Sequence, residues 1–327
     1  MFGVFIFKLI IILTSAPLYL LPHRINRSPN RGDSLICAAH FFLSTKKNKM
    51  KSTSVLICCK NVEHLIGKSL ASIAVQEPAK IIIVDGSSTD NTVAICKRYT
   101  SHIIQDPGKG LGYARSLGVR SVDTPYVIIM SPDDILPREF LHHSTQEIIN
   151  SSNDTAALLA PKSFQQPQTF WDRGQNEIYR IQSCLSIRVV GNPSIYRTAY
   201  LKSYDYDKTF SANEDTDLCE RWSRNGLKVG WLKTTHTMEI ESCNFRQFKK
   251  RYNWYGEGDY RFCLKWLPIC PRVALRHFLH PLYTYMIVYS IISINKFRLD
   301  VAFFAMFCGI FRYEGFFAAA FKQFVRK

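Results

Sequence analysis

The sequence is poor in acidic residues relative to basic ones. It has 26 Asp and Glu against 42 Lys and Arg, which gives a formal net charge of +16 at pH 7 over 327 residues. A positive excess of this size favours a negatively charged partner, and nucleic acid, an anionic membrane face and a phosphorylated substrate all fit its sign. Apolar stretches near both termini favour the membrane, and we expect no nucleic acid partner.

Cysteine spacing of the metal-binding kind is missing. The ten cysteines are scattered along the chain, and no two of them form a CxxC pair. This argues against a zinc site and gives no sign of a disulfide framework. We therefore expect free, mostly buried thiols in a reducing compartment.

The common phosphate-binding glycine loops are also missing. No GxxxxGK[ST] sequence occurs, and the loop with Gly108, Gly110 and Gly112 does not have the GxGxxG spacing of a dinucleotide fold. No internal repeat or low-complexity segment is visible, and apolar residues make up 46% of the chain. The composition is that of a folded protein with one large or two modest domains.

The most informative stretch that is present is Ile81–Thr92, which reads IIIVDGSSTDNT. Its apolar run has the length and composition of a strand buried on both faces of a parallel sheet. Gly86 allows a tight turn, and the small polar residues after it can cap a following helix. Asp85 would lie at the carboxyl end of the strand, where open α/β sheets bind ligands. An ordinary strand-to-helix connection would have the same pattern.

Strands and helices alternate in the first half of the sequence. Short apolar runs that predict strands lie at 54–59, 81–84, 102–105 and 126–130. The segments between them have the helical spacing of apolar residues, and Asn61 is the expected N-cap of the first helix. This alternation predicts a largely parallel sheet with helices on both of its faces.

The middle of the sequence is less regular. Short strands are expected at 156–160, 184–190 and 227–232, and a glycine-led turn into a helix start is expected at 191–196. The acidic run 213–217 (NEDTD) predicts the beginning of a strong helix, for which Gly226 supplies the C-cap.

The first 50 residues allow three interpretations. Val4–Leu21 is apolar and long enough to span a bilayer or to serve as a signal segment. Arginines and lysines follow it, which would hold the downstream side in the cytoplasm. The third interpretation is that translation begins at Met50. We therefore leave residues 1–50 out of the fold argument.

The character of the sequence changes after Cys243. Aromatic residues three or four apart, beginning at Phe245, are interleaved with lysines and arginines. This pattern is typical of a basic amphipathic helix on a membrane surface, although a helix packed on the core with a solvated basic face would share it. The apolar segments Phe278–Ile294 and Val301–Ala320 are both interrupted by polar residues or proline, so two crossings and a hairpin dipping into one leaflet remain open.

Carboxylates gather where strands are expected to end or a helix to begin. These carboxylates are Asp85, Asp133, Asp134, Glu214 and Asp215. Paired carboxylates in such places can hold a hard divalent cation that neutralises phosphates, or can act as a base toward a hydroxyl. Acidic residues at helix N-termini are also common for stability alone, so their joint order along an α/β chain carries the argument.

With its carboxylates in this order along the chain, the segment Ser54–Leu232 resembles a family 2 glycosyltransferase of the GT-A fold. The matching pieces are LICCKNVEHLIGKSLASI, VDGSSTDNT, GKGLGYARSLG, YVIIMSPDDIL and YDKTFSANEDTDLCERWSRNGLKVGWL. The resemblance implies an α/β, GT-A-like fold with a mostly parallel central sheet flanked by helices. Taken with the charge and apolar patterns outside this segment, the expected division is a leader at 1–50, a glycosyltransferase domain at 51–240, a basic interfacial helix region at 241–275 and apolar membrane-associated helices at 276–327.

The resemblance also implies a donor pocket. Asn61 and Asp85 would contact the nucleoside of a nucleotide-sugar donor, and Lys109 and Arg115 would lie close to the nucleotide and its phosphates. Asp134 would help to hold the metal or the donor sugar.

The same resemblance implies the reacting groups. Asp133 would bind Mg²⁺ or Mn²⁺ across the diphosphate. Asp215 would be the base that deprotonates the acceptor hydroxyl, and Glu214 would orient it or share that role. Similar enzymes invert the anomeric centre in a single displacement.

The sequence departs from the family pattern at three places. Ser131 stands where the family usually has Asp, so metal binding would fall to Asp133 and to Asp134 beside it. Cys59-Lys60-Asn61 replaces the usual turn after the first strand. A further metal ligand is expected after the last strand, and His236, Glu239 and Glu241 all lie near that place.

Together these observations predict an inverting, metal-assisted glycosyltransferase of the hexosyltransferase type. It would move a sugar from a nucleotide-sugar donor to a lipid-linked or polysaccharide acceptor, at a membrane, with its catalytic domain facing the cytoplasm. One alternative is a sugar-phosphate nucleotidyltransferase, although Val55–Lys60 leads to no glycine-rich basic loop. The other is a catalytically degenerate membrane-anchored binding protein, which Ser131 favours and the acidic residues oppose.

Overall fold

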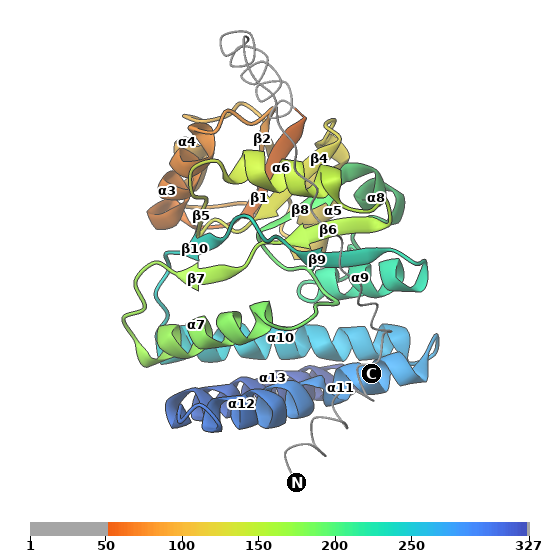
Figure 1. Cartoon of the computed structure of the whole chain (residues 1–327). Helices are drawn as coiled ribbons and strands as arrows, with labels where there is room; N and C mark the ends of the chain where they lie inside the picture. The colour runs from red at the N-terminus through yellow and green to blue at the C-terminus, as the bar shows by residue number, and fades with distance from the viewer. Residues whose placement is uncertain (1–51, 326–327) are drawn as a thin grey trace, which may run out of the picture. The chain divides into compact units, whose positions relative to one another are not determined.

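The computed structural model describes residues 52–325, in which strands and helices alternate and a layer of helices follows (Figure 1). The strands are β1 (Thr53–Cys59), β2 (Ile81–Asp85), β3 (Ile103–Gln105), β4 (Tyr126–Met130), β5 (Asp134–Ile135), β6 (Thr155–Leu159), β7 (Lys162–Phe164), β8 (Ser194–Arg197), β9 (Lys228–Trp231) and β10 (Thr237–Glu239). The helices before the final layer are α3 (Glu63–Ala74), α4 (Thr92–Cys96), α5 (Leu111–Ser121), α6 (Phe140–Asn150), α7 (Phe170–Ser183), α8 (Thr198–Tyr204) and α9 (Glu214–Arg224). The final layer is α10 (Phe245–Trp266), α11 (Pro271–His280), the π-helix η1 (Pro281–Tyr289), α12 (Ser290–Ile294) and α13 (Leu299–Val325).

The main sheet has seven strands in the order β3-β2-β1-β4-β8-β6-β9. The first four strands in this order are mutually parallel, and β8 is antiparallel to both of its neighbours. Helices α3, α4 and α6 cover one face and α5, α8 and α9 cover the other, so β1 and β2 are buried on both faces. The predicted GT-A-like α/β class, with a mostly parallel sheet flanked by helices, is confirmed.

The register of the sheet brings the strand ends together. Cys59 at the end of β1 lies opposite Asp85 at the end of β2, and Ile57 lies opposite Met130 at the end of β4. The loops that follow these strands therefore meet at one edge of the sheet, the place at which open α/β sheets bind ligands.

A second sheet of three strands lies in the order β5-β10-β7. Within it Glu239 pairs with Asp134 on one side and with Phe164 on the other. The sequence did not predict β7 or β10, because each is only three residues long and has no alternating apolar pattern.

Two local predictions are wrong. The segment 184–190 forms no strand, and the strand is β8, in the segment for which a turn into a helix was expected. Ile187 and Val189 instead pack as irregular chain against the core, while Ile195 takes the central position between β4 and β6. Their apolar composition alone could not separate these two environments.

The second wrong prediction concerns the cap of the first helix. The N-cap of α3 is Val62, with no side-chain cap bond, and Asn61 lies one residue earlier with a φ of 53°. The Asn61 amide oxygen accepts instead from the backbone N–H of Thr89, at 2.8 Å. Asn61 therefore connects the loop after β1 to the loop after β2.

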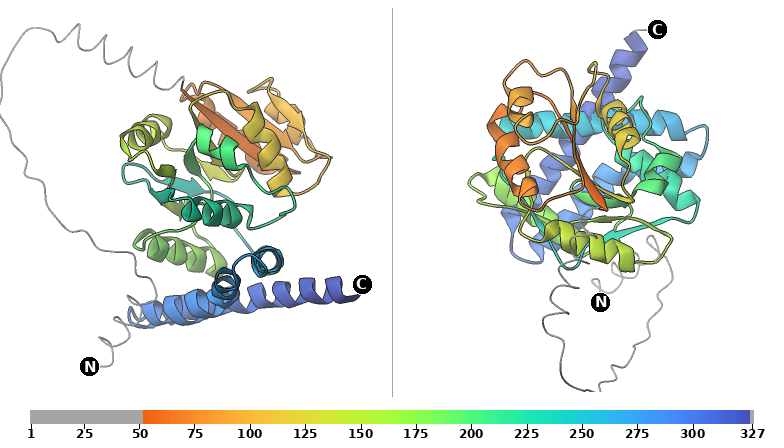
Figure 2. Two further views of the ribbon diagram at one scale, coloured as in Figure 1. Left: turned by 90° about the vertical axis from the view of Figure 1, so that its right-hand side faces the viewer. Right: turned by 90° about the horizontal axis from the view of Figure 1, so that it is seen from above.

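The final layer of helices packs against α7 and α9, as Figures 1 and 2 show. Phe248, Tyr252 and Phe304 form the centre of its apolar core. α13 is the one helix among residues 52–325 that is long and apolar enough to cross a membrane, and half of its apolar window is buried in the protein. The predicted leader at 1–50 lies outside the described residues.

Two glycines set the approach of α10 to α13. A Cβ added at Gly315 would meet the backbone carbonyl of Asn253, and one added at Gly256 would meet the carbonyl of Arg312. The backbones of the two helices are therefore in direct contact, and any larger residue would force them apart.

We expect Gly315→Ala to lower the free energy of unfolding by about 1–3 kcal/mol, because the new methyl group overpacks this crossing. The matched control is Gly67→Ala, also inside a helix, where the new methyl group would lie 3.6 Å from Ile95. It should be neutral or stabilising by up to about 1 kcal/mol. Denaturant titration in one buffer measures both. Equal effects of the two variants would contradict this account of the crossing.

Candidate active site

The predicted nucleoside side of the site is built by the loops after β1 and β2. The Asp85 side chain is buried, and one of its oxygens accepts from the backbone N–H of Ser88 at 3.0 Å. The other oxygen is buried and accepts no hydrogen bond from the described residues. Asn61, which also holds the second loop, is exposed beside it. The structure therefore brings Asn61 and Asp85 to the same edge of the sheet.

The loop that carries Lys109 adjoins this pocket. The backbone N–H of Asp106 donates to the carbonyl of Asp85 at 2.8 Å, and the buried Asp106 carboxylate accepts from the N–H of Gly108 at 3.2 Å. Gly108 and Gly110 both have positive φ, so the turn requires glycine at these positions. The exposed Lys109 ammonium lies over the ring of Tyr113, 5.2 Å from its centroid.

Arg115 lies deeper than the sequence suggests. Its side chain is buried, and its Nη1 lies 2.5 Å from Oε1 of Glu214 and 4.0 Å from Oδ2 of Asp215. With the Asn192 amide oriented to satisfy both of its ends, the amide oxygen accepts from Nη2 of Arg115 at 2.6 Å. Arg115 therefore holds the acidic pair, and Lys109 is the cation that remains exposed at the loop.

The two predicted reacting carboxylates at the start of α9 differ in environment. Glu214 is 2% exposed, whereas the side chain of Asp215 is 22% exposed. Burial raises the pKa of Glu214 to about 7, with Arg115 opposing the rise and Asp215 adding to it. Asp215 is therefore the member of the pair that a substrate can reach.

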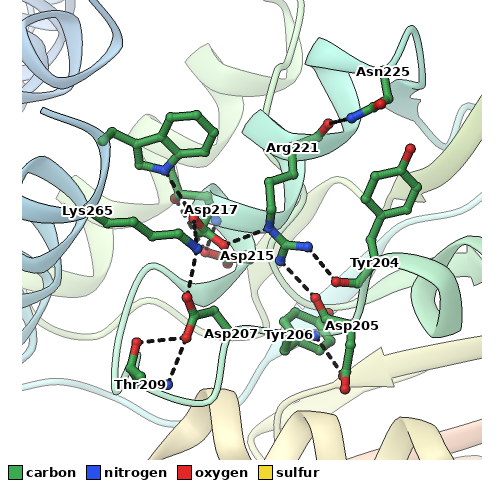
Figure 3. A network of polar contacts seen from close by, with 12 residues as sticks. Tyr204, Asp205, Tyr206, Asp207, Thr209, Asp215, Asp217, Arg221, Asn225 and Lys265 are labelled. Atoms are coloured by element: carbon green, nitrogen blue, oxygen red, sulfur yellow. Dashed lines mark hydrogen bonds and ion pairs between the residues drawn. The ribbon is translucent and has the colours of Figure 1, made fainter. Parts of the chain in front are cut away.

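A polar network holds the first turn of α9 in place. Asn213, which precedes Glu214, has a φ of 62° and donates through Nδ2 to Oδ1 of Asp259 at 2.7 Å. Two residues beyond Asp215, the buried Asp217 binds Arg221 at 2.9 Å and Lys265 at 2.7 Å (Figure 3). Asp217 is thus an anchor of the helix, although the sequence alone does not distinguish it from Asp215.

Asp133 and Asp134 occupy different environments. Asp134 is completely buried, accepts from the N–H of Ser131 at 3.0 Å and lies 2.7 Å from Nζ of Lys162. Asp133 lines a cleft, and its carboxylate has no hydrogen bond or ion pair with any residue that the structure describes. Burial, with Glu239 and Asp134 nearby, raises the pKa of Asp133 to about 7.

The cleft has a volume of about 520 Å³ and is lined from two sides. Ser131 and Asp133 come from the end of β4, whereas Arg251 and Trp254 come from α10. Glu241 also lines it, while His236 is exposed outside it. The basic helix predicted after Cys243 therefore forms a wall of the site, a role that the sequence did not predict.

The lining of the cleft includes a cluster of charged residues that the sequence also did not predict. Glu239 accepts from the hydroxyl of Tyr179 at 2.9 Å and lies 3.6 Å from Lys162 and 3.3 Å from Arg251. Burial opposes its ionisation, but Lys162 and Arg251 lower the pKa of Glu239 below its usual range. Among the three residues considered as a further metal ligand, Glu239 is thus committed to protein cations.

The chain connects the two halves of the site. The Asn192 amide, which contacts Arg115, also lies 3.4 Å from Oγ of Ser131 in the cleft. On the other side, the carbonyl of Tyr255, which lines the cleft, lies 3.5 Å from Nδ2 of Asn213. The turn that carries Asp215 therefore adjoins the cleft that contains Asp133.

The residues that line the cleft could supply only part of the coordination of a divalent cation. In residues 52–325 no group of three or more His, Cys, Asp or Glu side chains is arranged to hold a metal ion. Asp133 supplies one unpaired carboxylate, and its neighbouring acids favour a cation there. Mg²⁺ is often held by one or two carboxylates together with substrate phosphates and water, which is consistent with a single protein ligand.

Loss of the Lys162 cation should be costly. We expect Lys162→Met to lower the free energy of unfolding by about 3–5 kcal/mol at pH 8, because it leaves Asp134 and Glu239 buried with too little positive charge. The loss should shrink at pH 5, since unpaired buried carboxylates have raised pKa values and protonate as the pH falls.

The matched control for this prediction is Lys80→Met. Lys80 pairs with Asp123, whose side chain is 66% exposed, and such a pair contributes about 0–1 kcal/mol. Denaturant titrations at pH 5 and pH 8 compare the two variants. A pH-independent loss in Lys162→Met would count against the buried charge cluster.

The known proteins that the chain resembles are glycosyltransferases. The family model described as Glycosyl transferase family 2 matches residues 54–252, which is more than half of the chain. The poly(ribitol-phosphate) beta-N-acetylglucosaminyltransferase TarS of Staphylococcus aureus is 25% identical over 169 residues, covering 48% of this chain and 29% of TarS. The dolichyl-phosphate hexose transferase of Haloferax volcanii is 30% identical over 106 residues, covering 32% of this chain and 46% of that protein.

Among solved structures, the crystal structure of S. aureus TarS 1-349 matches with a TM-score of 0.49 at 15% identity. The match covers 83% of this chain and 91% of that one. The chain spans less than half the length of the two curated relatives named above.

Proposed function

Because the chain belongs to glycosyl transferase family 2 and is a glycosyltransferase, we propose that it moves a sugar from a nucleotide-sugar donor to an acceptor hydroxyl with inversion. The observation that carries this proposal is the meeting of three features at one sheet edge: a buried Asp85 oxygen that accepts no hydrogen bond from residues 52–325, an Asp133 carboxylate with no ion pair to those residues, and a partly exposed Asp215. Family membership also sets aside the nucleotidyltransferase alternative.

The donor's nucleoside fits the pocket formed by the loops after β1 and β2. Asp85 has a buried oxygen that can accept a hydrogen bond from a ribose hydroxyl or a base N–H, which would remove the cost of leaving it unpaired. Asn61 borders the same pocket. Lys109, exposed on its glycine loop, is placed to approach the phosphates. Asp134 has an indirect role at the neighbouring cleft, where it holds Lys162.

Asp215 acts as the base in this proposal. One of its carboxylate oxygens takes the proton of the acceptor hydroxyl while that oxygen bonds to the anomeric carbon, and the bond from that carbon to the nucleoside diphosphate breaks. Glu214 and Arg115 form the buried ion pair behind Asp215 and fix its position. Because the base and the leaving group lie on opposite sides of the sugar, a single displacement inverts the anomeric centre.

Asp133 would hold the divalent cation, Mg²⁺ or Mn²⁺. When bound, such a cation neutralises the charge that develops on the leaving diphosphate. The protein's own part is to keep the Asp133 carboxylate unpaired toward the cleft, which it does by engaging Asp134 and Glu239 with Lys162 and Arg251.

The acceptor is proposed to be lipid-linked or a polysaccharide, reached at the cytoplasmic face of a membrane. The names of the two relatives contain a poly(ribitol-phosphate) and a dolichyl-phosphate, both of which carry phosphate. The exposed Lys250 on the cleft wall supports an acceptor of this kind, as does the aromatic ring of Trp254 beside it. The apolar helix α13 supports the membrane.

Replacement of the base or of the proposed metal ligand tests this mechanism. We expect Asp215→Asn to reduce sugar transfer by about 10²–10⁴-fold, because the acceptor proton then has no base. Asp133→Ala should also reduce transfer and should abolish its dependence on added Mg²⁺ or Mn²⁺. Release of nucleoside diphosphate and formation of product measure both. The control is Asp123→Asn. Asp123 is an exposed acid that precedes β4, at the other end of that strand from Asp133, and this variant should keep full activity.

Unchanged rates in both variants would overturn the catalytic assignment and would favour the alternative of a degenerate binding protein. Correct folding of the variants can be checked by their unfolding midpoints, since Asp215 is partly exposed and Asp133 already lies among other acids.

The pH profile tests the ion pair behind the base. Arg115 opposes the burial that raises the pKa of Glu214, so Arg115→Met should raise that pKa above about 7. If catalysis requires ionised Glu214, the acidic limb of the kcat/KM profile should move to higher pH in this variant. Arg120→Met, on the same helix but with a side chain that is 62% exposed, should leave the limb unchanged. A lower maximum with an unmoved limb would show that Glu214 need not be ionised.

A further inference from the structure

Exposed apolar side chains gather on one part of the molecule. Among the large apolar residues that the structure exposes, all but Val75 and Leu185 lie between Phe245 and Val325. On α13 they recur along the whole helix, at Leu299, Phe303, Ile310, Phe317, Phe321 and Phe324. Others follow α11, η1 and α12, which lie beside α13 (Figure 1). We call the exposed apolar residues of α11 to α13 the apolar face.

The polar residue in the middle of α13 points away from the apolar face. Arg312 is buried, and its guanidinium binds both carboxylate oxygens of Asp259 on α10, one at 2.7 Å and the other at 2.5 Å. Gly315 brings the backbone of α13 against Asn253 of α10. The helix therefore turns Arg312 and Gly315 toward the protein, whereas several of its phenylalanines are exposed on the outer side, the reverse of a helix whose outer face meets water.

The packing of α13 is inconsistent with a helix surrounded by lipid. Half of its apolar window is buried against the protein, and α10 packs across it (Figure 2). α10 carries lysines and arginines, including Lys249, which pairs with Glu314 of α13. If α13 crossed a bilayer in this arrangement, these charges would enter the hydrocarbon at a cost of about 2.5–3.5 kcal/mol each.

The charge around the apolar face fits an anionic lipid surface. Residues 245–325 contain 12 Lys and Arg against 4 Asp and Glu. Arg272 on α11, Lys322 on α13 and Lys296 in the turn between α12 and α13 are exposed and have no ion pair with any described residue. An apolar surface rimmed by unpaired basic residues has the composition of proteins that lie on anionic membranes.

We propose that the apolar face docks on an anionic lipid surface with α13 in the plane of a single leaflet, without crossing the bilayer. The docking itself is argued from the surface alone, whereas the statement that a lipid-anchored acceptor is reached there rests on the proposed function. The docking also accounts for the two faces of α10. Residues 247, 250, 251 and 254 line the cleft, whereas Phe248, Tyr252 and Asp259 face the helices from α11 to α13. The cleft then lies about one helix diameter, ~10 Å, above the leaflet, within reach of a lipid-anchored acceptor.

Depth measurements on the full chain test this proposal directly. An environment-sensitive fluorescent amino acid is placed singly at Phe303, Ile310 or Phe321, and the protein is bound to vesicles that contain phosphatidylcholine and phosphatidylglycerol. Lipids brominated at different depths then quench the probe. Docking in the plane predicts a blue-shifted emission and similar shallow depths at all three positions. A probe at Ile310 that is much deeper than the other two would indicate a crossing, and no blue shift would indicate no contact with lipid. Either result overturns the proposal.

Paired charge variants separate this surface from any anchor elsewhere in the chain. Phe317→Glu with Phe321→Glu, at side chains that are 57% and 69% exposed, should abolish the blue shift at Phe303 and weaken vesicle binding at least tenfold. Val75→Glu with Leu185→Glu adds the same charge at exposed sites outside the face and should change neither. Equal effects of the two pairs would contradict a docking role for the face.

Activity distinguishes a failure of this inference from a failure of the proposed function. The Phe317→Glu and Phe321→Glu variant should transfer sugar normally to a water-soluble acceptor and at least tenfold more slowly to a lipid-linked acceptor in vesicles. If the protein transfers no sugar at all, the proposed function fails while the probe depths still report on docking. If the variant keeps full activity on the acceptor in vesicles, docking does not deliver the substrate and that part of the inference is wrong.

Discussion

The arrangement of the site depends on the ionic and hydrogen-bonding contacts of one buried carboxylate, that of Asp259. It binds Arg312 of α13 and His277 of α11, and it receives the side-chain N–H of Asn213, the residue that precedes the two acids of α9. Burial opposes its ionisation, yet Arg312 and His277 hold the pKa of Asp259 well below its usual range. Asp259 thus carries a full negative charge between the apolar helices and the proposed catalytic turn. The position of Asp215 and the packing of α13 are therefore set by one ionic centre.

A consistent electrostatic pattern extends from this centre to the rest of the site. Two of the fully buried acids at the site have a cation of the protein beside them: Glu214 has Arg115, and Asp134 has Lys162. Asp133 and Asp215, the acids proposed to hold the metal and to deprotonate the acceptor, have less complete partners among the described residues. Removing one member of a buried pair leaves an uncompensated charge, so the pairs fix the geometry that the two remaining acids need.

The parallel sheet and the order of the acids could be predicted from the sequence. Apolar runs predict buried strands, and the turn of Gly and Ser residues after Asp85 predicts the end of a strand, because both patterns depend on neighbouring residues alone. The sequence could not show that Arg115 turns inward, that Asp217 is an anchor, or that Asp134 is sealed by Lys162. Those properties arise from contacts between residues distant in sequence, for example Lys162 on β7 and Glu239 on β10, whose strands are too short to leave a pattern. Strand β8 was missed because composition did not separate it from the apolar chain before it.

The central claim is that Asp215 and the donor's diphosphate act on opposite sides of one sugar, and the stereochemistry of the product tests it most directly. Purified full-length protein is incubated with a nucleotide-sugar donor of known anomeric configuration, Mn²⁺ and an acceptor, and the new linkage is read from the anomeric proton coupling by NMR spectroscopy. A single displacement predicts that an α-linked donor gives a β-linked product. A product that retains the donor's configuration would contradict the account, because it would require a second displacement or attack from the side of the leaving group.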